Sequence, residues 1–475
     1  MAKRVSVHKF GGTSVGDRDA IRRSTQLMID AANRQPTLAV VSACSGTTDL
    51  LVLCWERARC GFLNQAIAVW EGIKRRHQDL ANQLLEPQGE RAYQRWLQLK
   101  SPELLELLKR AGEGALPADQ AFVIGTGEFL SSQLIHQVLL EQGQGCVWID
   151  ARDLIRGTGS ALEIEPQDDA CHHAIGKTLK PLFQHHSLVL TQGFVGQDGL
   201  GQPALLGRGG SDFSAGLFAH FLDAESLVIW TDTLGVLSAD PRKVPEARTI
   251  PELRYEEARV LAQLGAKVLH PRSVDHPFRK HIPVWVKSSF QPHAFGTVIR
   301  PSAQPLARVR SITAKSDVVW VHTPPAQPAE PFPALWQNRL DCDAISITHE
   351  GWSAVLPQSK FIDWLEKSPL EGKRLQVERG LALVSVVGQR LNEVHWMVAE
   401  TVKVLASAQL KAKLIACSPN GTSFSLLVPE GSQDRAVALL HAHLFQRTER
   451  RELMRARRRI QKLSAFEQTP SRPFA

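Results

Sequence analysis

Of the 475 residues, 43% are hydrophobic and 22% are charged, a composition typical of a soluble globular protein. The chain is too long for one ordinary core, so we expect two or three domains. No apolar run approaches the length of a membrane span, and the N-terminal MAKRVSVHKF lacks the apolar core of a signal peptide. Seven cysteines are scattered without metal or redox spacing, which favours reduced thiols in a cytoplasmic protein. Because no run is long enough to span a membrane, we expect no membrane partner.

The net charge of +8 is concentrated near the C-terminus. Residues 447–462 hold eight basic and two acidic side chains, so they contribute +6 and leave +2 for the rest of the chain. Leu453, Ala456 and Ile460 recur at helical spacing, and we predict that residues 447–475 form a basic helical tail docked by its apolar side. A basic stripe confined to a tail is usually a solvated helix face, so we do not expect nucleic acid as a partner.

Short apolar runs that end in small or glycine-rich turns predict the strands. The first includes Val5 and Val7, and the later ones are Thr37–Cys44, Ser187–Gly196, Ser226–Asp232 and Ile282–Ser289. Helical patterns fall between them, for example at Ala20–Asn33, Leu104–Arg110 and Glu256–Leu264. Continuous apolar strands separated by helices predict an α/β fold with a mainly parallel central sheet sandwiched by helices. In such sheets, ligands bind at the carboxyl ends of the strands.

The amino-acid composition of the chain changes near residue 300. GTVIRPSAQPLARVRS carries prolines and polar residues, as a hinge between domains does, and Thr323–Pro333 is too rich in proline for regular structure. Short strand and helix candidates follow. We therefore predict a catalytic domain over 1–300, compact paired α+β modules over 301–446, and the tail over 447–475.

The stretch VHKFGGTSVG places a lysine before two glycines. A strand delivers Lys9 to the edge of the sheet, and Gly11 and Gly12 let backbone amides approach an anion. The following GDRDA begins a helix capped by Asp17 or Gly16, which aims a positive helix end at the same place. Lys9 would then act as a mobile charge on phosphoryl oxygens. Taken alone, a tight turn with a solvated lysine explains the stretch equally well.

Four further stretches carry weaker signals. GRGGSD sets Arg208 among glycines, suited to a bidentate carboxylate clamp, with Asp212 before a helix; by itself it is more typical of a turn with a helix cap. Thr231, Asp232 and Arg242 occur in the stretch WTDTLGVLSADPR, and Lys267 occurs in GAKVLHPRS. In GTGEFLSSQL, Glu128 lies at what we interpret as a helix start. The paired histidines at 172–173 and 185–186 point apart on regular elements, so we expect no metal site there.

Together these stretches resemble the aspartokinases, within the amino-acid kinase family. The resemblance rests on KFGGTSVG, VVSACSGTTDLL, GTGEFLSS, TQGFVG, LLGRGGSDFSAG, WTDTLGVLSADPRKV and GAKVLHPRS; it is close over residues 3–300 and looser to about 445. It implies phosphorylation of the β-carboxylate of L-aspartate by ATP, with Mg²⁺ carried by the nucleotide, to give 4-phospho-L-aspartate. That reaction is the first step toward lysine, threonine and methionine.

The resemblance also implies a role for each matching residue. Catalysis is assigned to Lys9 and Asp212. Aspartate binding is assigned to Thr48, Glu128, Arg208, Gly209, Gly210 and Ser211, with Glu128 on the ammonium and Arg208 on the α-carboxylate. Nucleotide binding is assigned to Lys9, Gly11, Gly12, Thr231, Asp232, Arg242 and Lys267. Leu237 stands where the family commonly has a tyrosine, which affects nucleotide contacts more than catalysis.

The C-terminal modules resemble ACT domains, the small βαββαβ sensors of aspartokinases. ERGLALVSVVG and CSPNGTSFSLLVPE are most similar to the kinase part of methionine-linked bifunctional aspartokinase–homoserine dehydrogenases, but we expect no dehydrogenase here. The first module departs from the effector-binding pattern, so a homodimer through the ACT region is expected at least as much as an amino-acid effector. Two alternatives stay open: another amino-acid kinase of the same fold, and a catalytically silent ACT-bearing regulatory subunit.

Overall fold

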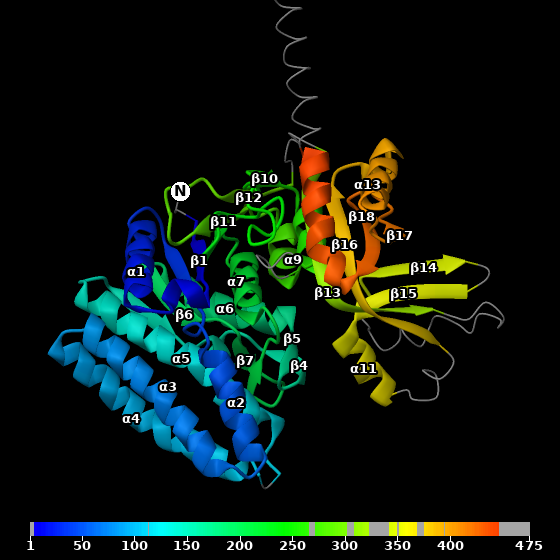
Figure 1. The fold of residues 1–475 in the computed structure, drawn as a ribbon. Coiled ribbons are helices and arrows are strands. Elements are labelled where there is room, and N and C mark those ends of the chain that lie inside the picture. The colour runs from blue at the N-terminus through cyan, green and yellow to red at the C-terminus, as the bar shows by residue number, and fades with distance from the viewer. Residues whose placement is uncertain are drawn as a thin grey trace, which may run out of the picture. The chain divides into compact units, whose positions relative to one another are not determined.

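The computed structural model describes residues 4–112, 114–265, 271–301, 308–322, 342–348, 351–367, 375–393 and 395–445 (Figure 1). They form two compact units. The first comprises Met1–Val236, Thr249–Arg259 and Lys267–Ala303, and the second comprises Leu237–Arg248, Val260–Ala266 and Gln304–Ala475. Residues 237–248 thus group with the second unit, although they lie within the catalytic region 1–300 that the sequence predicts. The predicted tail and the proline-rich stretch Thr323–Pro333 lie outside the described residues.

An eight-stranded sheet organises the first unit, in the order β10-β12-β11-β9-β1-β2-β6-β3. From β11 to β3 every neighbouring pair is parallel, whereas β12 runs antiparallel to β11 and parallel to β10. The predicted mainly parallel sheet is therefore confirmed. Its strands are β1 (Ser6–Phe10), β2 (Thr37–Val41), β3 (Cys146–Ile149), β6 (Leu188–Gln192), β9 (Ser226–Thr231), β10 (Glu252–Leu253), β11 (Val284–Ser288) and β12 (Thr297–Ile299). Two small antiparallel pairs join β4 (Gly157–Ser160) with β5 (Glu163–Pro166), and β7 (Val195–Gln197) with β8 (Pro203–Leu205).

Helices cover both faces of this sheet. On one face lie α1 (Arg18–Ala32) and α5 (Pro117–Glu141), and packed with α5 are α2 (Thr47–Arg59), α3 (Leu63–Leu84) and α4 (Pro87–Arg110). On the other face α7 (Gly210–Phe221) packs with α6 (Asp168–Leu182) and α9 (Pro271–Arg279). The residues of α8 (Tyr255–Gln263) are divided between the two units. Every residue of β1, β2 and β6 is buried, as expected for parallel strands covered on both faces.

The turn between β1 and α1 follows the local sequence closely. Residues Gly12–Val15 form a short 3₁₀ turn, and α1 begins at Arg18. The Asp17 carboxylate accepts a hydrogen bond from the Ala20 amide at 2.8 Å, which satisfies one of the free N–H groups at the helix start. The predicted cap by Asp17 is confirmed.

The second unit contains a six-stranded antiparallel sheet in the order β14-β15-β13-β16-β18-β17. Two hydrophobic clusters pack along its two long strands, one around Ile312, Val384 and Phe424 and the other around Val319 and Trp352. This arrangement agrees with the expected small α+β modules. The elements are β13 (Val309–His322), β14 (Ala344–Thr348), β15 (Gly351–Pro357), α11 (Gln358–Lys367), β16 (Gln376–Gly388), α13 (His395–Ser407), β17 (Lys413–Cys417), β18 (Ser423–Pro429) and a helix over 433–445.

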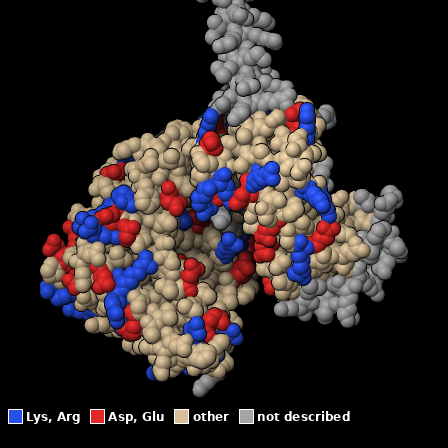
Figure 2. Space-filling view, in the orientation of Figure 1, with Lys and Arg blue, Asp and Glu red and all other residues tan. Residues whose placement is uncertain are grey.

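On the face that Figure 2 shows, described basic and acidic side chains are interspersed, and neither sign forms a broad patch of its own. Within the described ranges, no helix combines the length and the hydropathy needed to cross a bilayer.

Candidate active site

Six parallel strands of the first unit end at one edge of the sheet, where several of the predicted site residues lie. Lys9 is the penultimate residue of β1, in register with Val40 of β2 and Ile229 of β9. Its side chain is buried although it carries a charge. A buried cation needs a partner, because removal from water without one is costly.

Asp212 is the partner of Lys9. The Lys9 ammonium lies 2.5 Å from the Asp212 carboxylate, and both side chains are largely shielded from solvent. Asp212 belongs to the first turn of α7, which begins at Gly210, so the positive end of that helix points at the same region. The pair joins segments 203 positions apart in the chain, and it fixes the ammonium at the carboxyl edge of the sheet.

Gly12, the second of the two glycines that follow Lys9, is needed for space. A Cβ on Gly12 would lie 3.0 Å from the Ala43 carbonyl oxygen, because the turn packs directly against the loop after β2. The Gly11 amide donates to the Trp230 carbonyl at 3.3 Å, so this N–H is used within the fold. The Gly12 amide makes no hydrogen bond to another described residue, so a ligand could use this donor.

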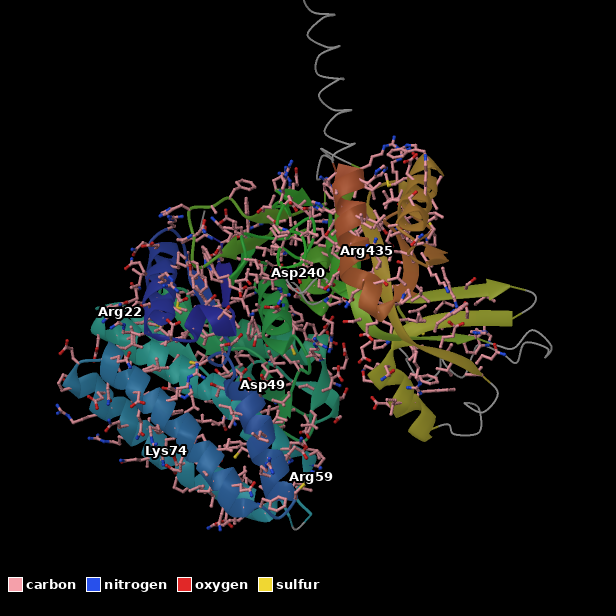
Figure 3. The ribbon with its side chains drawn as sticks, viewed as in Figure 1. Arg22, Asp49, Arg59, Lys74, Asp240 and Arg435 are labelled. Carbon is pink, nitrogen blue, oxygen red and sulfur yellow. The ribbon has the colours of Figure 1, made fainter. Side chains whose placement is uncertain are left out.

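The loop after β2 leads into α2. Gly46 has a φ of 78°, a left-handed conformation that glycine adopts without strain, and the helix starts at the next residue. Thr48 lies half-buried in the first turn beside Asp49, and Arg59 lies at the far end (Figure 3). Acidic and basic side chains at the two ends complement the helix dipole.

Glu128 lies in the interior of α5, and the predicted helix start at this residue is wrong. The helix begins at Pro117, and the GTG stretch before Glu128 is helical. Its glycines serve close packing: a Cβ on Gly127 would lie 2.9 Å from the Ala43 Cβ. The small Gly127 thus lets α5 approach the loop after β2.

The Glu128 carboxyl is deeply buried and only partly satisfied. Its Oε1 accepts a long hydrogen bond of 3.4 Å from the Ala43 amide, and Oε2 has no hydrogen-bond partner in the described part of the chain. Burial raises the pKa of Glu128 to about 8, against the smaller opposing effects of the Ala43 amide and the Lys9 charge. A carboxyl held in this way is ready to receive a cationic ligand group.

Arg208 lies between two glycines in left-handed conformations, Gly207 at φ 74° and Gly209 at φ 72°. Its side chain is exposed and makes no ion pair among the described residues. Directly after it, Gly210 begins α7 in a position where a Cβ would lie 2.6 Å from the Phe194 ring. Ser211 packs equally closely, since a Cβ on Gly193 would lie 2.7 Å from its Cα.

The predicted nucleotide residues are spread over the chain. Thr231 ends β9, and its hydroxyl lies 3.1 Å from the Asp232 carboxylate. Arg242 belongs to the second unit, where it pairs with Asp240 at 2.6 Å. Lys267 lies outside the described residues.

Arg76 of α3 is a positioning residue that the sequence did not reveal. Its guanidinium donates to the Ser45 carbonyl at 2.8 Å and to the Gly16 carbonyl at 2.9 Å, so it ties the loop after β2 to the turn after β1. Nothing in the local sequence marks this arginine, because both acceptors are backbone groups far away in the chain. Cys44 in the same loop is buried, which raises the pKa of its thiol to about 12 and agrees with a structural role.

The parallel sheet, the lysine held at its carboxyl edge and the buried carboxyl nearby define an α/β small-molecule kinase. Residues 4–288 match the model of the amino acid kinase family, and the chain belongs to this family. The family resemblance read from the motifs is thereby confirmed.

Aspartokinases are among the relatives. Lysine-sensitive aspartokinase 3 of Escherichia coli (strain K12) is 31% identical over 463 residues, which cover 93% of this chain and 99% of that protein. The bifunctional aspartokinase/homoserine dehydrogenase 2 of Zea mays is 27% identical over 93% of this chain, which spans 50% of that protein. The structure of E. coli aspartokinase III with aspartate and ADP (R-state) matches with a TM-score of 0.82 at 28% identity, covering 93% of this chain and all of that one.

Proposed function

We propose that this protein is an aspartate kinase that transfers the γ-phosphoryl group of ATP to the β-carboxylate of L-aspartate. The observation that carries the proposal is the ion pair of Lys9 with Asp212 at the same sheet edge as the buried, half-satisfied Glu128. The product would be 4-phospho-L-aspartate, the first intermediate toward lysine, threonine and methionine. The similarity to an enzyme solved with aspartate and ADP supports the same substrate pair.

Glu128 and Arg208 would hold the amino-acid end of aspartate. The ammonium would complete the coordination of Glu128, and its charge would favour the ionised carboxylate that burial alone disfavours. The exposed Arg208 could form a bidentate pair with the α-carboxylate. Thr48, Gly209, Gly210 and Ser211 would line the same substrate, leaving its β-carboxylate free to face the phosphate end.

Lys9 would act on the phosphoryl group. Its ammonium, oriented by Asp212, would neutralise charge on the transferring oxygens, and the Gly12 amide and the start of α7 would add fixed dipoles. A carboxylate nucleophile is already ionised at neutral pH, so the protein needs no general base for its attack. Catalysis would therefore depend on positioning and charge neutralisation.

The nucleotide would lie along Gly11, Thr231 and Asp232; Arg242 and Lys267 are the further nucleotide contacts that the resemblance to aspartokinases implies. Glycine at position 12 holds the turn against the loop after β2, where a Cβ would meet the Ala43 carbonyl, and the Gly12 amide could donate to a phosphate. Mg²⁺ would enter with the nucleotide, since this ion usually keeps phosphate and water ligands and takes few carboxylates from the protein.

The second unit would form the regulatory part, with a homodimer made through this ACT-like region. The E. coli aspartokinase III structure determined with lysine and aspartate (T-state) also matches this chain, with a TM-score of 0.73. An amino-acid effector is therefore proposed for the second unit as well. Light scattering of the purified protein tests the homodimer, and the hydroxamate assay described below, run with and without lysine, threonine or methionine, tests the effector.

A hydroxamate assay with ATP and L-aspartate tests the function, because hydroxylamine traps the acyl phosphate. Succinate, which lacks the ammonium, and L-glutamate, which is one methylene longer, serve as matched substrates. We expect product with L-aspartate and little with either analogue. Equal rates with succinate would contradict the role of Glu128, and no product with any amino acid would contradict the proposed function.

A further inference from the structure

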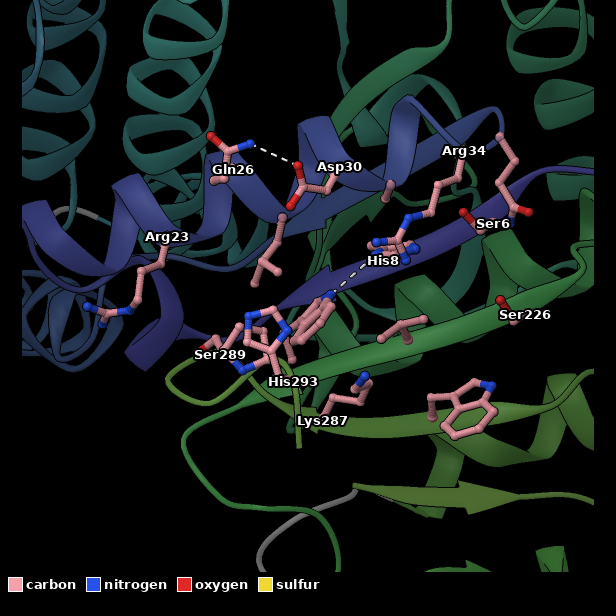
Figure 4. A pocket seen from close by; sticks show the side chains of 17 residues that line it. Ser6, His8, Arg23, Gln26, Asp30, Arg34, Ser226, Lys287, Ser289 and His293 are labelled. Atoms are coloured by element: carbon pink, nitrogen blue, oxygen red, sulfur yellow. Dashed lines mark hydrogen bonds between the residues drawn. The ribbon is translucent and has the colours of Figure 1, made fainter. Parts of the chain in front are cut away.

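The first unit contains a cavity of about 560 Å³ on the sheet face opposite Lys9 (Figure 4). Successive residues of a strand point to opposite faces, so Lys9 faces α7 while its neighbours Ser6 and His8 face α1 and line the cavity. A volume of this size falls within the range of ordinary small-molecule sites, about 300–1,000 Å³.

Three adjacent strands form the floor of the cavity, in register. His8 of β1 pairs with Val228 of β9, which pairs with Trp285 of β11; one step along, Trp230 pairs with Lys287. One face of α1 forms the wall and contributes Arg23, and Arg34 follows just after the helix ends (Figure 4). The lining is therefore built from regular elements rather than from loops alone.

The lining carries more positive than negative charge. Three side chains are cationic, Arg23, Arg34 and Lys287, whereas Asp30 is the one acidic residue that lines the cavity and accepts a hydrogen bond from Gln26 at 2.8 Å. No carboxylate of the described residues forms an ion pair with Lys287. Burial and the charge of Arg34 lower the pKa of Lys287, so the ammonium gains stability from a nearby anion.

Flat rings and hydrogen-bond donors complete the lining. The indoles of Trp230 and Trp285 both face the cavity, and the Lys287 ammonium lies 5.7 Å from the centre of the Trp230 ring. The Trp230 N–H donates to His8 Nδ1 at 3.2 Å, so the neutral His8 ring carries its proton on Nε2. Burial lowers the pKa of His8 to about 4, which keeps the ring neutral at physiological pH.

We propose that this cavity is a second ligand site, separate from the Lys9 edge, for a small organic anion that carries a planar ring. Lys287 and Arg34 would receive the anionic group, and the two indoles would contact the ring. In a parallel sheet this face is usually covered by apolar side chains and a helix. Here Ser6, His8 and Lys287 lie on it, which a packed core would not require.

Binding of 8-anilinonaphthalene-1-sulfonate, a ring anion that fluoresces when bound, tests the site on the full-length protein. ADP and L-aspartate are kept at saturating concentration to occupy the Lys9 edge. We expect binding to weaken about tenfold or more in Lys287→Met, to persist in Lys287→Arg and to be unchanged in Lys177→Met, an exposed lysine of α6. Trp285→Leu should weaken it independently of the charge.

Three further measurements separate a specific site from general adsorption. N-phenyl-1-naphthylamine, which has the rings without the sulfonate, should bind more weakly than the anion, and equal binding would overturn the proposal. Adenosine monophosphate and indole-3-carboxylate serve as competitors, one a phosphate and the other a carboxylate of this class. Displacement of the bound dye by one or both supports the site and identifies the preferred anion. Displacement by neither overturns the proposal. Lys287→Met should keep wild-type activity in the hydroxamate assay, so failure of this site is distinguishable from failure of the proposed function.

Discussion

Glu128→Gln should have two opposite effects, a more stable free protein above acidic pH and a loss of aspartate binding. Glutamine has nearly the same shape as glutamate but cannot ionise. Glu128 is buried, and its pKa is raised from 4.5 to about 8, mainly by burial. The folded protein therefore keeps a proton on this carboxyl that the unfolded chain releases.

The sign and size of the change in the free energy of unfolding with pH follow from that difference in pKa. The stability associated with this proton is at its full value below pH 4.5, and it is lost as the pH rises through 8. At about 1.4 kcal/mol per pH unit, the interval from 4.5 to about 8 gives an upper limit of about 5 kcal/mol, of which about 3 kcal/mol is lost by pH 7. Glutamine removes this dependence, so the variant and the wild type should be closest near pH 5 and furthest apart above pH 8.

Urea unfolding at pH 5 to 8.5 without ligands measures the difference in free energy of unfolding between the two proteins. Glu225→Gln, an exposed carboxylate, is the control and should show no such trend. The hydroxamate assay should show a KM for aspartate raised about a hundredfold or more, because removing one member of a buried ion pair costs about 3 kcal/mol or more. Parallel stability curves would refute the raised pKa, and an unchanged KM would refute the contact with the ammonium.

Three other substitutions test the remaining parts of the site. Lys9→Ala should lower kcat about a thousandfold while the protein stays folded by circular dichroism, since a charge directed at the transferring group is lost; near-wild-type turnover would remove Lys9 from the mechanism. Arg208→Ala should raise the KM for aspartate about 10- to 100-fold, with smaller effects on the KM for ATP, because a charge-assisted pair is lost; the opposite pattern would assign Arg208 to the nucleotide. Gly12→Ala should lower the free energy of unfolding, measured in urea, by about 1–3 kcal/mol and also reduce activity, since the new methyl would press on the Ala43 carbonyl at 3.0 Å. An unchanged free energy of unfolding would mean that the loop after β2 moves aside without cost.

The local sequence determined those features that depend on nearest neighbours. Mostly apolar runs predicted β2, β6, β9 and β11, because strands buried on both faces consist mainly of apolar residues. Asp17 marked the start of α1, since a cap is satisfied by an amide only three residues away. The glycines before and after Arg208 indicated a turn, and in the structure both adopt left-handed backbone, which other residues adopt only with strain.

Tertiary structure decided the features that depend on contacts between distant segments. The sequence predicted a helix start at Glu128, yet the GTG before it lies within the helix, and Gly127 packs against Ala43. The same close packing buries the Glu128 carboxyl and raises its pKa, which no local pattern could indicate. The ion pair of Lys9 and Asp212, the bonds from Arg76 to two loops and the cavity opposite Lys9 arise in the same way. Each depends on which strands and helices lie side by side, and long-range packing alone fixes that arrangement.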